Sequence, residues 1–271
     1  MTGLVMNARM YAVTPEVEAA WRGVLERVTA EAGLAFEYLP YPAPQPLEDL
    51  WRRPDLGCAF MCGFPVALRL ADVRPLAAPI PSLDWAGGRA VYRSDLIVRR
   101  EASFRTLADT YGGVAGWTVE HSQSGFNAFR HRLLRDRSAG RPSLFREVRG
   151  HLVTARRILD GVADGSIDVG PLDAYWHALL ARHRPELTRP VRVLESTPPT
   201  TAPAFVAGPA LPDEAAARLA AAFAQASSRP WFPPFGETLL LSGFAPVRRE
   251  DYAVTLAWDE EARAAGYPVP A

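Results

Sequence analysis

The sequence predicts an α/β protein built from two lobes, and three observations support this class. The chain has 271 residues, which exceeds what one hydrophobic core usually holds, so two lobes or one large α/β domain are expected. Strand-like and helix-like segments alternate, which is typical of parallel sheets with crossover helices. Two extended segments, near residues 89–99 and 195–203, are interpreted as crossovers between a lobe of residues 1–94 and 197–271 and an inserted lobe of residues 95–196.

The first part of the chain is predicted to form a strand, a helix and a strand. Residues 4–13 are strand-like, and Thr14, Pro15 and Glu16 then give an N-cap, a proline at the first helical position and an early acid. Apolar residues recur at three- and four-residue spacing up to about residue 32, Gly33 ends the helix, and residues 34–39 form the next strand. A proline-rich loop over 41–46 and a short helix over 47–52 follow.

The apolar run 57–62 is predicted to be a strand covered on both faces. Gly63 and Phe64 follow it, at the strand end where open α/β sheets usually bind small molecules. The further strands are expected over 73–80, 114–119, 167–170, 192–194 and 204–207, and the further helices over 126–134, 152–164, 173–182 and 213–226. Residues 232–243 form an apolar segment broken by prolines, and 259–265 a short surface helix.

Composition excludes several classes of function. Thirty acidic residues balance thirty basic ones, which argues against nucleic acid or an anionic membrane as the partner. Cys58 and Cys62 lie in an apolar run and are expected to be core thiols rather than a disulfide framework or a zinc site. No apolar run is long enough to span a membrane, and no secretory signal is evident, so the compartment is periplasmic if a leader was removed and cytoplasmic otherwise.

A hydroxyl-rich turn precedes the predicted helix 126–134. It consists of Ser122, Gln123, Ser124 and Gly125. A helix start leaves about four backbone N–H groups unpaired and carries a partial positive charge, so this turn could hold an oxyanion without a cationic side chain. Serine also caps helices in most proteins, and a purely structural cap is the alternative.

The order of elements resembles the type II periplasmic-binding-protein fold. More narrowly, it is similar to the phosphate, phosphite and phosphonate family of substrate-binding proteins of ABC transporters. The segments that carry the resemblance span most of the chain: 92–98, 122–125, 150–151, 163–173 and 197–199. The resemblance implies a monomer that captures a small anion, phosphonate-like or carboxylate-bearing, between two hinged lobes. It implies that the ligand is delivered to a transporter permease or a sensor protein. It implies no catalytic residue and no cofactor.

The resemblance also implies which residues meet the ligand. Ser122, Gln123, Ser124 and Gly125 match the turn that holds the tetrahedral anion, and His151 and Asp173 match ligand-facing positions of the same lobe. His151 could donate to an oxyanion or could be a capping or core histidine. Asp173 suits an ammonium, a hydroxyl or a protonated oxygen, and an N-cap role accounts for it equally well.

The first lobe departs from the family pattern. Phosphonate-binding members usually have a tyrosine after the strand that corresponds to 57–62, whereas this chain has Gly63 and Phe64. A phenylalanine there favours a ligand with an apolar or aromatic body. Gly63, Phe64 and Tyr92 are therefore the expected ligand contacts from the first lobe.

Two other functions stay open from the sequence. A few proteins of this fold are enzymes that act on small metabolites such as menaquinone or thiamine precursors, yet the chain shows no nucleophile elbow, zinc-protease motif, phosphate loop or dinucleotide fingerprint. A ligand-sensing module is the other possibility. His121, His131 and His151 lack the spacing of a metal-binding set, so no metal site is expected.

Overall fold

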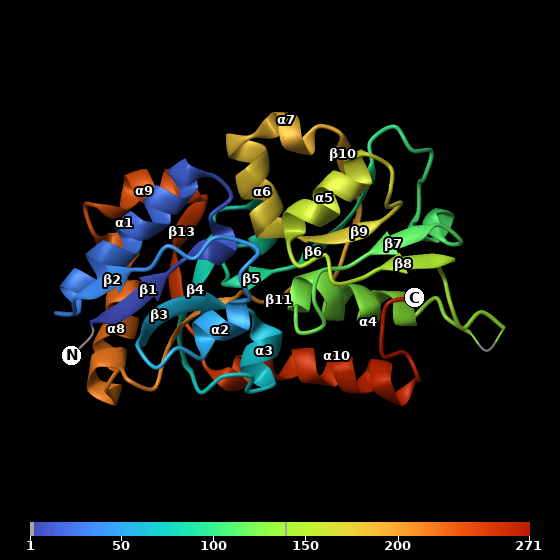
Figure 1. Cartoon of the computed structure of the whole chain (residues 1–271). Helices are drawn as coiled ribbons and strands as arrows, with labels where there is room; N and C mark the ends of the chain where they lie inside the picture. The colour runs from blue at the N-terminus through green and yellow to red at the C-terminus, as the bar shows by residue number, and fades with distance from the viewer. Residues whose placement is uncertain (1–2, 139) are drawn as a thin grey trace. The chain divides into compact units, whose positions relative to one another are not determined.

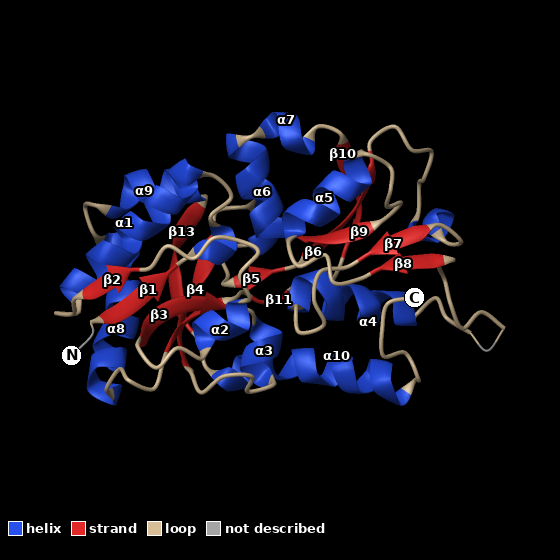
Figure 2. Cartoon of the chain, in the orientation of Figure 1, coloured by secondary structure: helices blue, strands red, loops and turns tan. Residues whose placement is uncertain are grey.

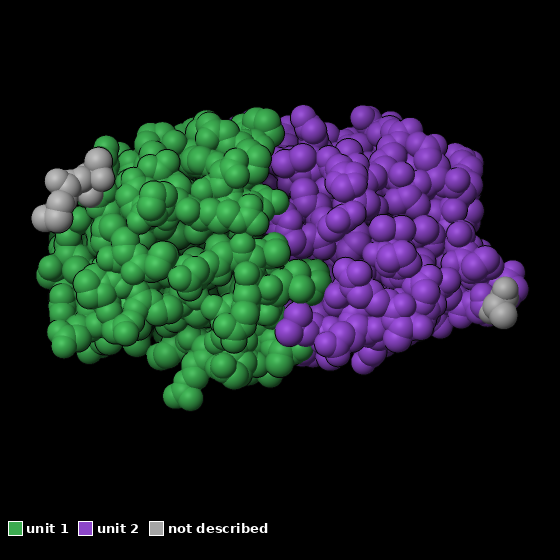
Figure 3. Space-filling model, turned by 60° about the horizontal axis from the view of Figure 1, so that its bottom comes forward, with its two compact units in different colours: residues 1–92, 201–253 green, residues 93–200, 254–271 purple. Residues whose placement is uncertain are grey.

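The computed structural model describes residues 3–138 and 140–271, which fold into two compact units (Figures 1 and 3). Unit 1 contains residues up to 92 and residues 201–253, and unit 2 contains residues 93–200 and 254–271. The chain therefore passes between the units three times, not twice as expected. The assignment of the whole segment 197–271 to the first lobe was wrong for residues 197–200 and for the tail after residue 253, which belong to unit 2.

Unit 1 is built on a six-stranded mixed sheet with the strand order β13-β4-β12-β3-β1-β2 (Figure 2). β1, β2 and β3 are mutually parallel, and β12 runs antiparallel to β3 and β4. The strands of the sheet are β1 (Leu4–Asn7), β2 (Phe36–Tyr38), β3 (Leu56–Met61), β4 (Arg74–Pro81), β12 (Ala204–Ala207) and β13 (Leu241–Pro246). The helices are α1 (Pro15–Glu31), α2 (Leu47–Trp51), α3 (Gly63–Ala67), α8 (Asp213–Gln225) and α9 (Phe232–Leu239).

Aromatic side chains fill the core of unit 1 between the sheet and its helices. Phe60 of β3 stacks on Phe205 of β12 with ring centroids 3.8 Å apart, and Trp21 of α1 meets Phe60 edge to face at 5.0 Å. Phe223 of α8 stacks on Phe205 from the next layer. Trp21 and Phe205 have no exposed surface. The run predicted as a strand covered on both faces is confirmed, because every residue of β3 is buried.

Unit 2 has a three-stranded antiparallel sheet with the order β10-β6-β9 and a parallel pair β7-β8. An isolated parallel bridge between Ala115 and Val169 joins β7 to the chain just before β9. The strands are β6 (Ser94–Arg99), β7 (Val114–Gly116), β8 (Glu147–Arg149), β9 (Gly170–Asp173) and β10 (Val191–Ser196). The helices are α4 (Ala128–Leu134), α5 (Ala155–Ala163), α6 (Ala174–His183), α7 (Pro185–Thr188) and α10 (Ala253–Ala264). Two short strands, β5 (Val91–Tyr92) and β11 (Thr200–Thr201), pair at the segments where the chain changes unit.

The C-terminal helix α10 is twelve residues long, so the surface helix predicted over 259–265 was too short, and the buried face of α10 packs on α4. Asp259 of α10 forms an ion pair with Arg130 of α4, whose side chain is completely buried. Trp258 stacks on His131 of α4 with ring centroids 4.7 Å apart. These contacts tie the tail to unit 2.

Candidate functional site

Five segments of unit 2 end or begin at one edge of its strands. β7, β8 and β9 are parallel, so their carboxyl ends share this edge. β6 runs antiparallel to both β9 and β10, which brings its first residue, Ser94, and the end of β10 at Ser196 to the same edge. The motif segments that are far apart in the sequence therefore meet where α/β sheets usually bind ligands.

The turn after β7 continues into a π-helix, η4 (Gln123–Asn127), which runs directly into α4. Short π-helical segments are rare in proteins overall, and those that occur often lie at functional sites. Ser122 is the N-cap, and its Oγ accepts a hydrogen bond from the N–H of Gly125 at 2.9 Å. The N–H of Thr118 donates to the Gly125 carbonyl at 3.1 Å, which closes the turn. The capping role that the sequence left open for Ser122 is thus present.

Gly125 is required by packing. A β-carbon at this position would lie 2.0 Å from Thr118 Oγ1 and 2.9 Å from Ser122 Oγ, closer than any side chain tolerates. The glycine therefore allows the start of η4 to approach the strand end. This accounts for Gly125 without a direct ligand contact.

Several donors at the start of η4 have no acceptor among the described residues. The backbone N–H groups of Gln123 and Ser124 precede the first π-helical hydrogen bond, which runs from Asn127 N–H to the Ser122 carbonyl. Thr118 Oγ1 and Gln123 Nε2 are buried, and no hydrogen-bond partner reaches them in the part of the chain that the structure describes. Buried polar groups are nearly always paired in proteins, so this concentration of unpaired donors is typical of a site that receives an acceptor.

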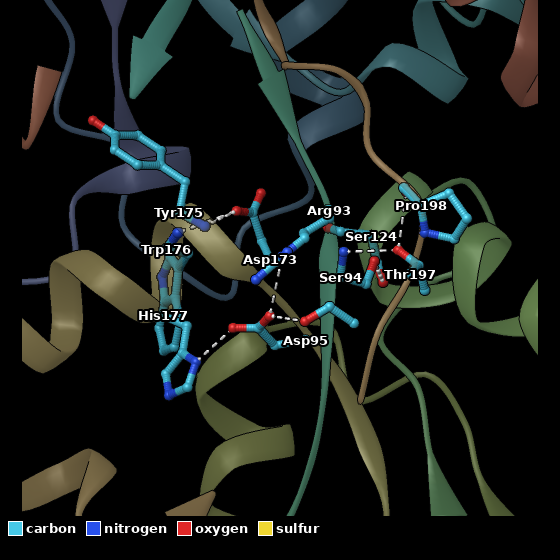
Figure 4. Close-up of polar contacts among 11 residues, drawn as sticks. Arg93, Ser94, Asp95, Ser124, Asp173, Tyr175, Trp176, His177, Thr197 and Pro198 are labelled. Atoms are coloured by element: carbon cyan, nitrogen blue, oxygen red, sulfur yellow. Dashed lines mark hydrogen bonds and ion pairs between the residues drawn. The ribbon is translucent and has the colours of Figure 1, made fainter. Parts of the chain in front are cut away.

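Ser94 and Thr197 brace the same turn from the neighbouring strands (Figure 4). Ser94 Oγ donates to the Ser124 carbonyl at 2.9 Å, and the Ser94 N–H donates to Thr197 Oγ1 at 3.0 Å. The Thr197 N–H donates in return to the Ser94 carbonyl at 2.9 Å. The segments 92–98 and 197–199, which the sequence related to the crossovers, thus hold Ser124 in place.

His151 lies in the exposed loop after β8, in the left-handed backbone region with φ of 54°. Its ring meets Trp117 edge to face, with ring centroids 4.6 Å apart. Gly150 is needed beside it, because a β-carbon there would lie 2.2 Å from the Trp117 indole. His151 is therefore oriented at the sheet edge by Trp117 and remains open to solvent. Its role toward a ligand stays a prediction.

Asp173 caps α6, as the alternative reading of the sequence held. Its Oδ1 accepts the backbone N–H groups of Tyr175 at 2.9 Å and Trp176 at 3.1 Å, and the residue is 8% exposed. These bonds place the carboxylate at the helix start and neutralise part of its charge. Figure 4 shows Asp173 beside Ser94, with which it pairs across β9 and β6.

A second polar cluster at this edge was not predicted. Asp95 accepts from Ser196 Oγ at 2.8 Å and lies 3.0 Å from His177 Nδ1 (Figure 4). Arg93 Nε lies 3.8 Å from the same carboxylate. The three partners come from positions up to 101 residues away in the sequence. The spacing along the chain gave no signal for this cluster, because only the strand pairing brings it together.

The three residues expected from the first lobe are buried within unit 1. Gly63 begins α3, and a β-carbon there would lie 2.3 Å from the ring of Tyr252. Phe64 is 2% exposed, and Tyr92 is part of the apolar cluster that contains Leu50. Packing thus explains Gly63 and Tyr92. A ligand contact for these residues stays a prediction.

Other residues singled out from the sequence have structural environments. Cys58 is fully buried, and this burial raises the pKa of its thiol. His131 Nε2 lies 2.8 Å from Glu261 Oε2. Across residues 3–138 and 140–271, no three His, Cys, Asp or Glu side chains are grouped as a metal ion would require. In the same residues, no helix combines the length and apolar character needed to cross a bilayer.

Solved structures with low sequence identity share this fold. A binding protein component of the ABC phosphonate transporter of Pseudomonas aeruginosa is 14% identical, with 97% of this chain and 88% of that chain covered and a TM-score of 0.79. PhnD1 from Prochlorococcus marinus in complex with methylphosphonate is 14% identical, with 96% and 98% covered and a TM-score of 0.77. A Xanthomonas citri protein bound to ATP is 19% identical, with 97% and 99% covered and a TM-score of 0.68. The predicted periplasmic-binding-protein-like fold is thereby confirmed.

The sequence itself identifies the family. The model described as "ABC transporter, phosphonate, periplasmic substrate-binding protein" matches residues 12–252. No curated protein sequence gives a significant match. Because the family model covers most of its length, the chain belongs to the phosphonate family of periplasmic substrate-binding proteins of ABC transporters.

Proposed function

We propose that this protein captures a small ligand carrying an oxyanion, either phosphonate- or phosphate-like or a carboxylate, and delivers it to the permease of an ABC transporter or to a sensor. The observation that carries the proposal is the start of η4, where the free N–H groups of Gln123 and Ser124 and the unpaired Thr118 hydroxyl gather at the ligand edge of unit 2. Family membership makes the periplasm the expected compartment and a membrane permease the expected partner.

Neutral donors at this edge can hold an oxyanion. Hydrogen bonds from neutral donors to a charged acceptor are each worth roughly 1.5–3 kcal/mol, so three or four of them can hold an anion without an arginine. The helix start adds a partial positive charge in the same direction. The carboxylate of Asp173 opposes a bare anion, although the α6 amides already bind one of its oxygens.

The position of Asp173 also indicates the rest of the ligand. An aspartate carboxylate can accept from an ammonium, a hydroxyl or a protonated oxygen of a ligand. A ligand with an anion at one end and a donor group nearby would satisfy both the η4 start and Asp173. Methylphosphonate and ATP, which are bound by the similar proteins, share an anionic group and differ in the body attached to it.

Binding and turnover are separated by one set of experiments. Native mass spectrometry would identify any compound that copurifies, and calorimetry would compare it with methylphosphonate, inorganic phosphate, phosphite, an alkyl sulfonate and a dicarboxylate. We expect one ligand per chain, recovered chemically unchanged. Conversion of the ligand would support an enzyme instead, and failure to bind every oxyanion in the series would overturn the proposal.

The expected closure of the two lobes on the ligand stays a prediction. It requires that a ligand interact more strongly with the closed state than with the open one. Small-angle scattering with and without a saturating ligand measures this directly. An unchanged radius of gyration would contradict the hinge and leave the binding proposal intact.

A further inference from the structure

We infer that the side-chain amide of Gln123 is a hydrogen-bond donor reserved for the ligand, and that a buried relay from α10 fixes its orientation so that it offers only N–H groups. The inference rests on the proposed function and adds a determinant of specificity to it. Gln123 is 1% exposed, and its Oε1 accepts from Asn127 Nδ2 at 2.8 Å. Its Nε2 is buried without an acceptor in the described residues.

The relay begins at Arg130, a side chain that can only donate. Arg130 has no exposed surface, forms an ion pair with Asp259, and donates through Nη1 to the Pro268 carbonyl at 2.9 Å. Its Nη2 reaches the side chain of Asn127 at 2.8 Å. Because a guanidinium has no acceptor, the atom of Asn127 that faces it must be the oxygen Oδ1.

This first assignment determines the next one. With Oδ1 directed at Arg130, the amide nitrogen Nδ2 of Asn127 faces Gln123 and also the Thr255 carbonyl, 2.8 Å away. A carbonyl can only accept, so the contact with Thr255 independently requires the same orientation. Asn127 is fully buried, which leaves solvent no means to stabilise the flipped amide.

The orientation of Gln123 follows. Asn127 Nδ2 is a donor, so the atom of Gln123 beside it must be the acceptor Oε1. The two ends of a planar amide diverge, and Nε2 therefore points away from Asn127. The assignment of oxygen and nitrogen in a glutamine amide is ordinarily ambiguous, but here two acceptor-only or donor-only neighbours settle it.

The consequence is a site that presents donors of two kinds from one residue. The backbone N–H of Gln123 lies at the helix start, and its side chain adds a buried N–H that cannot turn into an acceptor. The site therefore favours ligand oxygens that accept hydrogen bonds. It disfavours an ammonium or a hydroxyl proton at this position, because two donors would then face each other. Asn127 and Arg130 act as positioning residues, since they reach the ligand only through Gln123.

The decisive variant is Gln123→Glu. Asn127 continues to donate to one carboxylate oxygen, and the other oxygen becomes a charged acceptor that repels the anion. We expect affinity for methylphosphonate or inorganic phosphate, whichever the wild-type protein binds, to fall by at least ~10–100-fold near neutral pH. Gln225→Glu is the matched control, because Gln225 lies on the exposed surface of unit 1 with its Oε1 bound by Arg229. Its affinity should stay at the wild-type value.

The pH dependence separates ligand contact from a structural role. Protonation turns the introduced carboxyl into a donor, so the ratio of wild-type to Gln123→Glu affinity, measured at each pH, should shrink as the pH falls toward the pKa of that carboxyl. A structural defect would give a ratio that does not follow this titration. Gln123→Met should lose affinity to a similar extent at every pH, and it serves as the test if Gln123→Glu fails to fold.

Asn127→Asp tests the relay itself. An aspartate still accepts from Arg130 but no longer donates to Gln123, so the Gln123 amide is free to invert, and affinity should fall although residue 127 does not touch the ligand. Folded Gln123→Glu and Gln123→Met proteins with wild-type affinity would overturn the inference while leaving the proposed function standing. If the wild-type protein binds no oxyanion, both fail together.

Discussion

Gly125→Ala is the sharpest test of how the candidate site is built. The added methyl would lie 2.0 Å from Thr118 Oγ1 and 2.9 Å from Ser122 Oγ. Neither neighbour can withdraw freely, because Thr118 is 6% exposed and its N–H is bound to the Gly125 carbonyl at 3.1 Å. Overpacking of a buried site costs about 1–3 kcal/mol, and the short distance places this case at the upper end.

The assay is urea unfolding followed by circular dichroism, with Thr118→Ala as the second arm of a double-mutant cycle. Thr118→Ala removes both the hydroxyl and the methyl, whose carbon would lie 3.0 Å from the new β-carbon. The double variant should recover about 1–2 kcal/mol relative to additivity. Gly140→Ala is the control, since its β-carbon would meet nothing within 4 Å. Full stability of Gly125→Ala, or no recovery in the double variant, would refute this account of the turn.

Further predictions concern affinity, capping, pH and shape. Ser122→Ala with Ser124→Ala should lower oxyanion affinity by roughly ten- to hundredfold per residue in calorimetry, and unchanged affinity would reduce the turn to a cap. Asp173→Asn should preserve the α6 cap and the melting temperature while strengthening the binding of simple anions, because it removes a negative charge; weaker binding of the copurified ligand would reveal a donor group on that ligand. Arg130→Met should destabilise the protein by about 1–3 kcal/mol at neutral pH, measured by urea unfolding, because Asp259 loses one of its two arginine partners and the buried Asn127 oxygen and the Pro268 carbonyl lose a donor. Burial raises the pKa of Asp259, but hydrogen bonds from Arg130 and Arg263 outweigh it and leave the pKa below its usual value. This stabilisation is therefore present above about pH 3.9 and lost as the pH falls through the lower folded-state pKa, so the difference between Arg130→Met and wild type should shrink in acid.

Helices with clear start signals and a regular apolar period could be predicted from the sequence almost to the residue. The expected start at Pro15 is confirmed, with Thr14 accepting from the Val17 N–H. The proline-broken segment 232–243 contains a helix instead, α9, because its prolines fall in the first turn, where no N–H is needed. The strand expected over 167–170 is shifted to β9 (Gly170–Asp173), since pairing with β6 rather than local apolarity sets its register.

The candidate site was only partly accessible from local patterns. The hydroxyl-rich turn and the cap at Asp173 are short-range features, and the sequence allowed both the capping and the binding roles. Gly63 was expected to meet a ligand because it follows a strand, and Tyr92 because it lies at the first crossover. Their burial depends on tertiary contacts, for Gly63 with a tyrosine ring from the other end of the chain, and no spacing rule indicates such a contact.

The direction of the relay behind Gln123 shows what kind of information was missing. Each residue type is visible in the sequence, but an amide can serve as donor or acceptor until its neighbours are known. The assignment comes from Arg130 and Asp259, which lie 129 residues apart, and from Asn127 and Thr255, which lie 128 apart. Contacts from α10, acting through Arg130 and Asn127, thus determine which end of the Gln123 amide is the N–H donor. If Gln123 contacts the ligand as we infer, Arg130, Asp259 and Thr255 influence which ligand atoms the turn accepts, although they lie outside the turn.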